Sequence, residues 1–280
     1  MTTATLELTR SRFQIVHDEE APRSPGANRL KAHGWPADDR PRLKTAALDP
    51  IRIAWRRRDL VAAFSLVYSA YLRTGLMRPN PYQMRITPFQ LLPTTDVFVA
   101  SAGERPDVVC TMSLVGDGRL GLPMESLFAD EVSERRRLGI SMGEVSCLAD
   151  IQDVQAVGPS PLLKVMSFMA QRAQRKGIEE LLITVHPHHV KFYERLMGFE
   201  RIGKERAYDC VLGLPAVPLA LNLVEARVKH PRAWERFFGH AFPADALCDQ
   251  PITESVKAEF HQILAACSPP VDPENLGKAA

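Results

Sequence analysis

The apolar positions between residues 142 and 177 predict a strand followed by a helix. Residues 142–150, MGEVSCLAD, form a short run whose apolar residues suit a buried strand. After a proline-bounded loop, apolar residues recur at three- and four-residue steps and therefore share one face of a helix: Leu162, Met166, Met169 and Ala173. Gly177 then supplies a residue that readily adopts the left-handed conformation in which helices end.

The following residues predict a second strand and a second helix. Residues 181–185 are five consecutive apolar or β-branched residues, which is typical of a parallel strand covered on both faces. A helix follows over residues 187–198, with proline near its first position and glycine at its end. Parallel strands joined by a helix cross over in the right-handed sense, and ligands bind beyond their carboxyl ends. We therefore expect residues 144–149 to lie near His186 and Tyr193.

The rest of the chain adds further strands and helices to this pattern. The segments expected to be strands are residues 51–55, 97–100, 108–115, 205–211 and 217–223, with a hairpin turn around Gly103. The expected helices are residues 59–75, capped by Asp59, residues 124–138, and one or two helices within residues 228–265. Tyr68 and Tyr71 lie at helical spacing and are interpreted as core residues.

Composition limits the class of protein. The 280 residues are 45% hydrophobic and 24% charged, which is typical of a globular chain with one sizeable core, and a net charge of +2 does not indicate nucleic-acid binding. The five cysteines lack the spacing of a disulfide framework or a zinc site, which fits a reducing cytosol. No signal peptide and no apolar run of about 20 residues is visible. We therefore expect a cytoplasmic protein without a transmembrane segment, and peripheral membrane contact stays open.

Three regions are expected along the chain. Residues 1–49 hold several prolines among charges without a sustained period, which predicts a mostly disordered lead-in. Residues 50–225 contain the strand and helix patterns and form the predicted folded domain. Residues 226–280 are expected to add a C-terminal helical extension and a loose tail.

Five motifs between roughly residues 50 and 225 form a recognisable set. They are YSAYLRTGL, LLPTTDVFVA, SLVGDGRLGLPMESLF, GEVSCLAD and ITVHPHHVKFYERLMGFERIG. Together they resemble the long-chain N-acyl amino acid synthases, a family related to the acyl-homoserine-lactone synthases and the GNAT acyltransferases. The resemblance implies a GNAT-like α/β fold with a mixed, partly antiparallel central sheet flanked by helices. It also implies an N-acyltransferase that moves a long-chain fatty acyl group to the amine of an amino acid, with tyrosine or another aromatic one suggested.

The chemistry implied is attack of a primary amine on an acyl thioester. Glu144 is the candidate base, because a poorly solvated carboxylate has a raised pKa and can accept the amine proton directly or through water. Backbone N–H groups of Cys147, Leu148 and Ala149 are candidates for polarising the carbonyl, as in GNAT enzymes. Tyr193 matches the GNAT tyrosine that can protonate the leaving sulfur. The alternatives are a Glu144 at the solvated end of a strand and a Tyr193 that is merely buried with a satisfied hydroxyl.

Cys147 and the neighbouring histidines allow other interpretations. The acyl-homoserine-lactone synthase pattern has arginine where this chain has Cys147, so no role of that arginine transfers. A nucleophilic Cys147 would need a paired base, and a cysteine in an apolar strand is normally a packing residue. The histidines of residues 186–189 match no zinc motif, so no metal is expected, and His186 is assigned to helix capping or acceptor contact. Ser146, within the family-like EVS motif, is assigned to substrate binding.

Residues 76–90 are broken by prolines and are expected to form a loop over the site. In the acyl-homoserine-lactone synthases this region carries acidic residues that help bind the acceptor, whereas here it carries Arg78 and Arg85. A guanidinium suits the carboxylate of a free amino acid by bidentate hydrogen bonding. Arg78 and Arg85 are therefore assigned to substrate binding, with a solvated arginine as the alternative for either one.

The expected acyl donor is an acyl carrier protein thioester, preferred over acyl-CoA, and no cofactor is expected. GNAT enzymes bind the CoA pyrophosphate on consecutive backbone N–H groups of a glycine-rich turn. Residues 151–164 hold one glycine and two prolines at this turn, so the cradle is incomplete. Basic residues are candidates for contacting an acidic carrier protein: Arg135, Arg136, Arg137, Arg172, Arg175 and Lys176. A CoA-dependent GNAT N-acetyltransferase and a catalytically silent acyl-chain-binding protein are the alternatives.

Overall fold

The computed structural model describes residues 51–101, 107–151 and 161–267. Four features expected from the sequence lie outside these residues: the lead-in over residues 1–49, the turn at Gly103, most of the proline-bounded loop before residue 161, and the tail after residue 267. The elements below are those of the described residues.

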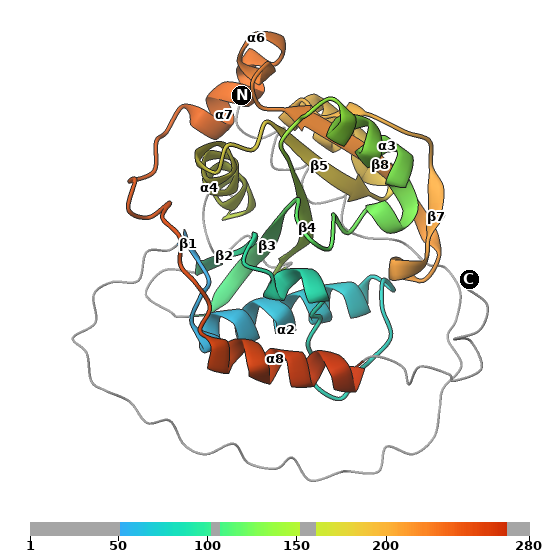
Figure 1. Ribbon diagram of the computed structural model, residues 1–280, viewed down its shortest axis with the longest axis vertical. Helices are drawn as coiled ribbons and strands as arrows, with labels where there is room; N and C mark the ends of the chain where they lie inside the picture. Colours follow the sequence, from blue (N-terminus) through green and yellow to red (C-terminus); the bar gives the residue numbers. More distant parts are fainter. Residues whose placement is uncertain (1–50, 102–106, 152–160, 268–280) are drawn as a thin grey trace. The chain divides into compact units, whose positions relative to one another are not determined.

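An eight-stranded mixed sheet forms the centre of the fold (Figure 1). Its strands are β1 Ile51–Ile53, β2 Thr95–Ser101, β3 Val108–Gly116, β4 Met142–Asp150, β5 Glu180–Val185, β6 Glu200–Arg201, β7 Arg206–Tyr208 and β8 Leu214–Asn222. The order across the sheet is β1-β2-β3-β4-β5-β8-β6, with β7 also paired to β8. Among these pairs β4–β5 alone is parallel. The predicted mixed, partly antiparallel sheet is confirmed, as is the antiparallel pairing of β2 with β3.

The parallel pair opens towards its carboxyl ends. Pairing of β4 with β5 runs only from Met142 to Val145 on β4. Beyond Val145, β4 continues beside β3 as far as Asp150, while β5 continues beside β8 as far as Val185. Backbone groups on the facing edges of the two strands therefore lose their partner strand at this point. Divergence at the carboxyl ends of neighbouring strands is where open α/β sheets bind ligands.

Helices cover both faces of the sheet. Side chains alternate along β2, so neighbouring residues of this strand contact different helices. Val97 points to one face, where it packs in a cluster with residues of α2 (Arg57–Arg73). The next residue, Phe98, points to the other face and meets α4 (Pro161–Arg175) through Phe168, with ring centroids 5.9 Å apart. The sheet is therefore buried between two helical layers.

Two more helices share the face covered by α2, namely α3 (Glu125–Arg137) and α8 (Glu254–Cys267). Phe128 of α3 packs in a cluster with Val115 of β3 and Leu182 of β5. α8 lies beside α2 (Figure 1), and the rings of Phe260 and Phe64 meet edge to face at 5.2 Å. This face thus has α2 and α8 over its β1 side and α3 over β3–β5.

The segment after β8 packs on both faces. It contains α6 (Ala226–Lys229), α7 (Pro231–Phe238) and α8, so the one or two helices predicted here correspond to α7 and α8. α7 is tied to α4, because the Ser167 hydroxyl donates a hydrogen bond to the Phe237 carbonyl at 2.6 Å. None of the described helices is long and apolar enough to cross a membrane. The domain boundary at residue 226, the cytoplasmic location and peripheral membrane contact stay predictions.

One predicted helix start is wrong. α2 begins at Arg57, and Arg56 occupies the capping position without a side-chain cap bond. The Asp59 carboxylate instead accepts hydrogen bonds from Arg52, at 3.1 Å from Nε and 2.8 Å from Nη2. A buried carboxylate gains more from a two-point guanidinium pair than from a helix N–H group. Asp59 therefore joins β1 to α2 rather than starting the helix.

The helix that follows β5 agrees with the prediction at both ends. α5 (Pro187–Phe192) begins at the predicted proline, and a π-helical turn, η3 (Tyr193–Met197), continues it. Gly198 ends this helix with φ +75°, and Gly177 follows α4 with φ +73°. Both glycines adopt the left-handed conformation that the sequence predicts at these positions.

Candidate functional site

Glu144 is buried in the middle of the sheet. It is 3% exposed and pairs in register with Val115 of β3 and Leu182 of β5. Its Oε2 accepts a hydrogen bond from the backbone N–H of Met124, just before α3, at 2.7 Å. Burial raises the pKa of Glu144 to about 8, and the Met124 N–H group opposes the shift. This burial contradicts the alternative of a solvated strand end, so Glu144 has the environment expected of a base.

Tyr208 of β7 lies beside Glu144. Its hydroxyl donates a hydrogen bond to the Pro123 carbonyl at 3.2 Å, and the next residue, Met124, holds Glu144. Burial raises the pKa of Tyr208, and the nearby charge of Glu144 adds to this shift. The sequence pattern indicated only a strand here. The one available signal was a tyrosine among the polar residues of an edge segment.

β4 carries a bulge directly after Ser146. Ser146 pairs with Ser113 of β3, but Ala149 pairs with Thr111, so β4 has one residue more than β3 over this stretch. Cys147 has φ +53°, a left-handed conformation that is uncommon for residues other than glycine. Of the three residues predicted to polarise the thioester carbonyl, Cys147 and Leu148 therefore form the bulge and Ala149 directly follows it, just beyond the point where β4 leaves β5.

The Cys147 side chain packs towards α2. It lies in a small apolar cluster with Val67 and Ala149, and its Sγ accepts a hydrogen bond from Gln90 Nε2 at 2.9 Å. The described contacts of Cys147 include no histidine or carboxylate that could deprotonate it. A nucleophilic cysteine needs such a base, so the contacts support the packing interpretation of this thiol.

Tyr193 is buried at the start of η3, with 8% exposure. Its ring meets Phe192 and Phe199 edge to face, with centroids 5.3 Å and 5.8 Å apart. Burial raises the pKa of its hydroxyl, and the charge of Asp150 at the end of β4 adds to the shift. The phenol therefore stays protonated at neutral pH and lies within electrostatic influence of the β4 end.

Tyr71 of α2 connects these residues, although the sequence pattern suggested only core packing. Burial raises the pKa of its hydroxyl. Cys147, Tyr193 and Tyr208 raise this pKa further, whereas the charge of Arg85 lowers it. Two of these neighbours are also close in space, because the Arg85 guanidinium lies over the Tyr71 ring and Tyr71 packs against the cluster that contains Cys147. The structure thus brings the β4 bulge and Tyr193 together with Arg85, and Tyr208 links this group to Glu144.

The two arginines predicted to bind the acceptor differ in their surroundings. The Arg85 guanidinium lies over the Tyr71 ring at 4.8 Å, and its Nη2 donates to the Cys210 carbonyl at 3.3 Å. Its Nε is buried without a hydrogen-bond partner among the described residues. A buried donor without a partner costs stability, so this group can accommodate an incoming acceptor. Arg78 is exposed and makes none of the described side-chain contacts with this group.

His186 directly follows the end of β5, and Ser146 lies on β4 directly after the last residue that pairs with β5. The Nδ1 atom of His186 accepts a hydrogen bond from the His188 N–H at 3.3 Å, so the predicted capping role is confirmed. Burial lowers the pKa of His186, and His188 lowers it further. Acceptor contact by His186 and substrate binding by the half-buried Ser146 stay predictions. The described part of the chain contains no group of three or more His, Cys, Asp or Glu residues placed to hold a metal ion.

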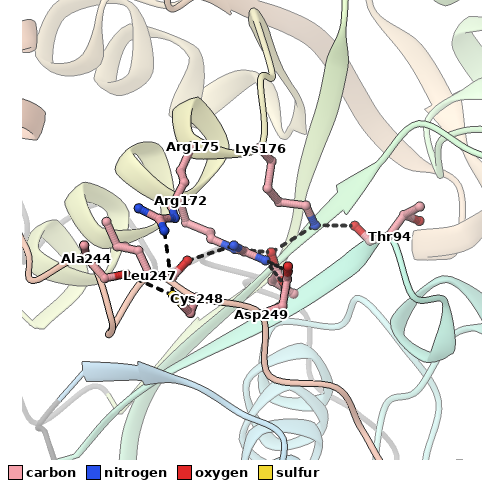
Figure 2. A network of polar contacts seen from close by, with 9 residues as sticks. Thr94, Arg172, Arg175, Lys176, Ala244, Leu247, Cys248 and Asp249 are labelled. Carbon is pink, nitrogen blue, oxygen red and sulfur yellow. Dashed lines mark hydrogen bonds and ion pairs between the residues drawn. The ribbon is translucent and has the colours of Figure 1, made fainter.

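Arg172, predicted to contact a carrier protein, is instead a buried structural residue. It is 2% exposed, its guanidinium pairs with Asp96 at 2.9 Å and also with Asp249, and Nη1 donates to the Leu247 carbonyl at 2.8 Å (Figure 2). Lys176 pairs with the same Asp96 carboxylate at 3.1 Å. The prediction for Arg172 is wrong, because a guanidinium enclosed by two carboxylates of its own chain cannot reach a partner.

The remaining basic candidates differ in availability. Arg135 pairs with Glu180 at 2.6 Å, and Arg136 pairs with both Asp117 and Glu125, at 2.8 Å and 2.5 Å. Two other candidates, Arg137 and Arg175, are exposed. Among the described residues, the side-chain hydrogen bond of Arg175 is a long one, 3.7 Å, to the Cys248 thiol (Figure 2). Arg137 and Arg175 therefore remain the available cations of the predicted set.

Comparison with protein families matches residues 62–222, more than half of the chain, to the model of the N-acyl amino acid synthase FeeM. The solved structure of FeeM, an N-acyl amino acid synthase from uncultured soil microbes, is 29% identical and has a TM-score of 0.56. The match covers 64% of this chain and 94% of that one. No match is found among curated protein sequences.

A second solved structure supports the fold. The acyl-homoserine-lactone synthase LasI is 16% identical with a TM-score of 0.51, and the match covers 69% of this chain and 95% of that one. At this identity the likeness shows the fold alone. The segment matched to the family model runs from α2 to the end of β8 and contains every residue of the group around Tyr71.

Proposed function

Because the chain belongs to the N-acyl amino acid synthase family and is an acyltransferase, we propose that it joins a long-chain fatty acyl group to the amine of an amino acid. The acyl group arrives as the thioester of an acyl carrier protein, and the acceptor is aromatic, with tyrosine as the first candidate. The observation that carries the proposal is Glu144, a buried carboxylate with a raised pKa beside the point where β4 and β5 part.

Glu144 removes the proton that the amine must lose. Its Oε2 is held by Met124, and among the described residues no donor reaches Oε1, which leaves that oxygen for the amine or an intervening water. With a pKa of about 8, the carboxylate is a stronger base than an exposed glutamate and is partly ionised near neutral pH. Both properties suit general-base catalysis of amine attack.

The reaction forms a C–N bond and breaks a C–S bond. The amine attacks the thioester carbon, and the carbonyl oxygen, which gains negative charge, is stabilised by backbone N–H groups of the β4 bulge. Collapse of this intermediate expels the thiolate of the carrier. The Tyr193 hydroxyl, protonated at neutral pH, donates its hydrogen bond to the leaving sulfur.

Arg85 binds the carboxylate of the amino acid. Its Nε is buried and has no hydrogen-bond partner among the described residues, and a guanidinium satisfies a carboxylate by two parallel hydrogen bonds. Tyr71 beneath the guanidinium and Tyr208 beside Glu144 supply aromatic surface for an aromatic acceptor. This arrangement favours Arg85 over Arg78 as the acceptor contact.

The carrier protein is favoured over CoA on two grounds. The turn that would bind a pyrophosphate holds Pro159 and Pro161, which lack N–H groups. The exposed Arg137 and Arg175 suit the acidic surface of a carrier protein. Attraction between exposed charges is screened over about 10 Å at 0.1 M salt, so transfer from the carrier should weaken steeply as salt is added.

The first experiment incubates the purified protein with a long-chain acyl carrier protein and mixed amino acids, and identifies N-acyl products by mass spectrometry. We expect an N-acyl aromatic amino acid. The second compares kcat/KM for one acyl chain delivered by the carrier and by CoA at low and high ionic strength. Equal rates from CoA with no effect of salt would contradict the carrier proposal and favour a CoA-dependent acetyltransferase. Binding without any product would favour the acyl-chain-binding alternative.

A further inference from the structure

Gln90 joins the acceptor loop to the β4 bulge. It lies in the short helix η1 (Pro88–Leu91) and is 1% exposed. Its Oε1 accepts hydrogen bonds from both the backbone N–H and the hydroxyl of Thr87, each at 2.6 Å. Because Thr87 occupies the oxygen, the orientation of the amide is set, and Nε2 is directed to Cys147 Sγ at 2.9 Å. Because both the oxygen and the nitrogen of this buried amide are hydrogen-bonded, the amide fixes the position of the Cys147 side chain.

The backbone conformation of Cys147 has to be held by contacts with surrounding residues. A left-handed φ is disfavoured for a residue with a Cβ atom, and it persists only where surrounding contacts impose it. Two kinds of contact act on Cys147, the hydrogen bond from Gln90 and apolar packing with Val67 and Ala149. The hydrogen bond is the directional one of the two. Its loss would let the bulge relax towards a conformation that an L-residue prefers.

We propose that Gln90 is a positioning residue for acyl transfer. Its amide holds Cys147 in the left-handed conformation, so that the N–H groups of the bulge point at the thioester carbonyl. This inference rests on the proposed function, in which those N–H groups stabilise the oxyanion.

The loop that carries Gln90 also carries Arg85, the proposed contact for the acceptor. Arg85 lies five residues before Gln90, and its backbone N–H is tied to the Phe64 carbonyl of α2 at 3.0 Å. The acceptor arginine and the oxyanion bulge are therefore held by one loop, anchored on α2 at one end and on β4 at the other. A displacement of about 1 Å at a reacting centre can cost about 10²-fold in rate, so this anchoring matters for catalysis.

Gln90→Met tests the proposal, because methionine has similar length and no hydrogen-bonding amide. We expect kcat to fall about 10- to 100-fold, as for a weakened oxyanion contact, with the KM for the amino acid within about twofold of wild type. The matched control is Gln171→Met on α4, which loses hydrogen bonds to Phe237 and His240. This control should lower the melting temperature and leave kcat unchanged.

A second background separates positioning from general destabilisation. Glycine adopts φ +53° without strain, so in Cys147→Gly the bulge no longer depends on Gln90. Adding Gln90→Met to Cys147→Gly should therefore change kcat by less than about threefold. An equal fall in both backgrounds, or a wild-type kcat in Gln90→Met, overturns the inference.

Amide NMR of residues 147–149 tests the conformational part without turnover. Gln90→Met should shift these three N–H resonances in the free protein, while Gln171→Met should not. Unchanged resonances in Gln90→Met overturn the inference even if kcat falls. A wild type that transfers no acyl group contradicts the proposed function instead, and the resonances still report whether Gln90 sets the bulge.

Discussion

Two buried carboxylates on the same sheet have opposite surroundings. Asp96 on β2 is 7% exposed and faces two cations, Arg172 at 2.9 Å and Lys176 at 3.1 Å. Glu144 on β4 is 3% exposed and receives one backbone N–H, with no cation among its described contacts. Burial alone would raise the energy of either negative charge. Partners offset this cost at Asp96, whereas at Glu144 the cost appears as a raised pKa.

This difference in surroundings distinguishes Asp96, which stabilises the fold, from Glu144, which is the candidate base. Asp96, Arg172 and Lys176 tie β2 to α4, and Asp249 with the Leu247 carbonyl adds the segment before α8 (Figure 2). The described hydrogen bond of the Glu144 side chain is the one from Met124, and with a pKa of about 8 this carboxyl group can exchange a proton near neutral pH. Perturbed pKa values of this kind are concentrated at functional sites.

The largest expected effect is on stability, from Asp96→Asn. Removing one partner of a buried ion pair leaves Arg172 undercompensated and should lower the free energy of unfolding by about 3–5 kcal/mol. Urea unfolding measures it. Asp249→Asn is the matched control: its side chain is 86% exposed, so its loss should cost less than about 1 kcal/mol. At temperatures where the variant is folded, kcat/KM should equal that of wild type, and a fall like that of a Glu144 variant would contradict the distinction.

Glu144→Gln should have the largest effect on catalysis. The amide keeps the shape of the carboxylate and removes its basicity, so kcat/KM should fall at least about 10²-fold near pH 7. In wild type, kcat/KM should also rise with pH until about 8 as Glu144 loses its proton. Glu180→Gln is the control. Glu180 lies on the neighbouring strand β5 and is a buried carboxylate paired with Arg135 of α3, so this variant should retain its kcat/KM. An unchanged rate in Glu144→Gln removes this residue from the mechanism.

Arg85→Ala should act on acceptor binding. Hydrogen bonds to a charged group contribute about 1.5–3 kcal/mol, so the KM for the amino acid should rise about 10- to 100-fold. The KM for its methyl ester, which lacks the carboxylate, should change far less. Arg78→Ala, on the exposed part of the loop, should leave both constants near wild type. Equal increases for acid and ester would show that Arg85 does not read the carboxylate.

The smallest change expected per unit of pH is in stability, which depends on the protonation of Glu144. The folded protein holds the Glu144 proton up to about pH 8, whereas an unfolded chain releases it near the usual value of 4.5. Between these values unfolding releases a proton, so the free energy of unfolding falls as pH rises, by at most about 1.4 kcal/mol per pH unit. Glu144→Gln should remove this slope, which unfolding curves at pH 5, 6, 7 and 8 can measure. Parallel slopes in both proteins would show that Glu144 is not the titrating group.

Much of the fold could be predicted because its signals are local. Gly177 and Gly198 end helices through their own conformational freedom, and the β-branched run of β5 reflects burial on both faces. The same locality explains the error at Asp59. An aspartate before a helical pattern is a good cap on local grounds, but Arg52 on another element competes for it.

Some residues of the candidate site could likewise be predicted from local sequence, and others could not. Glu144, Tyr193 and the residues of the bulge could be named from motifs, because they belong to short segments with a characteristic order along the chain. Gln90, Tyr71 and Tyr208 could not, because their roles arise from contacts with residues distant in sequence. The Gln90–Cys147 hydrogen bond spans 57 positions, and a one-residue bulge leaves no mark in a pattern of alternating apolar residues.

The sequence by itself determined the family, the mixed sheet and the strand that carries the carboxylate, because these follow from periodicity, turn residues and motifs. Only the tertiary structure decided which charges are paired. Arg172 and Arg175 lie three residues apart on α4, yet one is enclosed by carboxylates and the other is exposed. Pairing and burial depend on what other segments bring to the same place, and that is set by packing rather than by residue type.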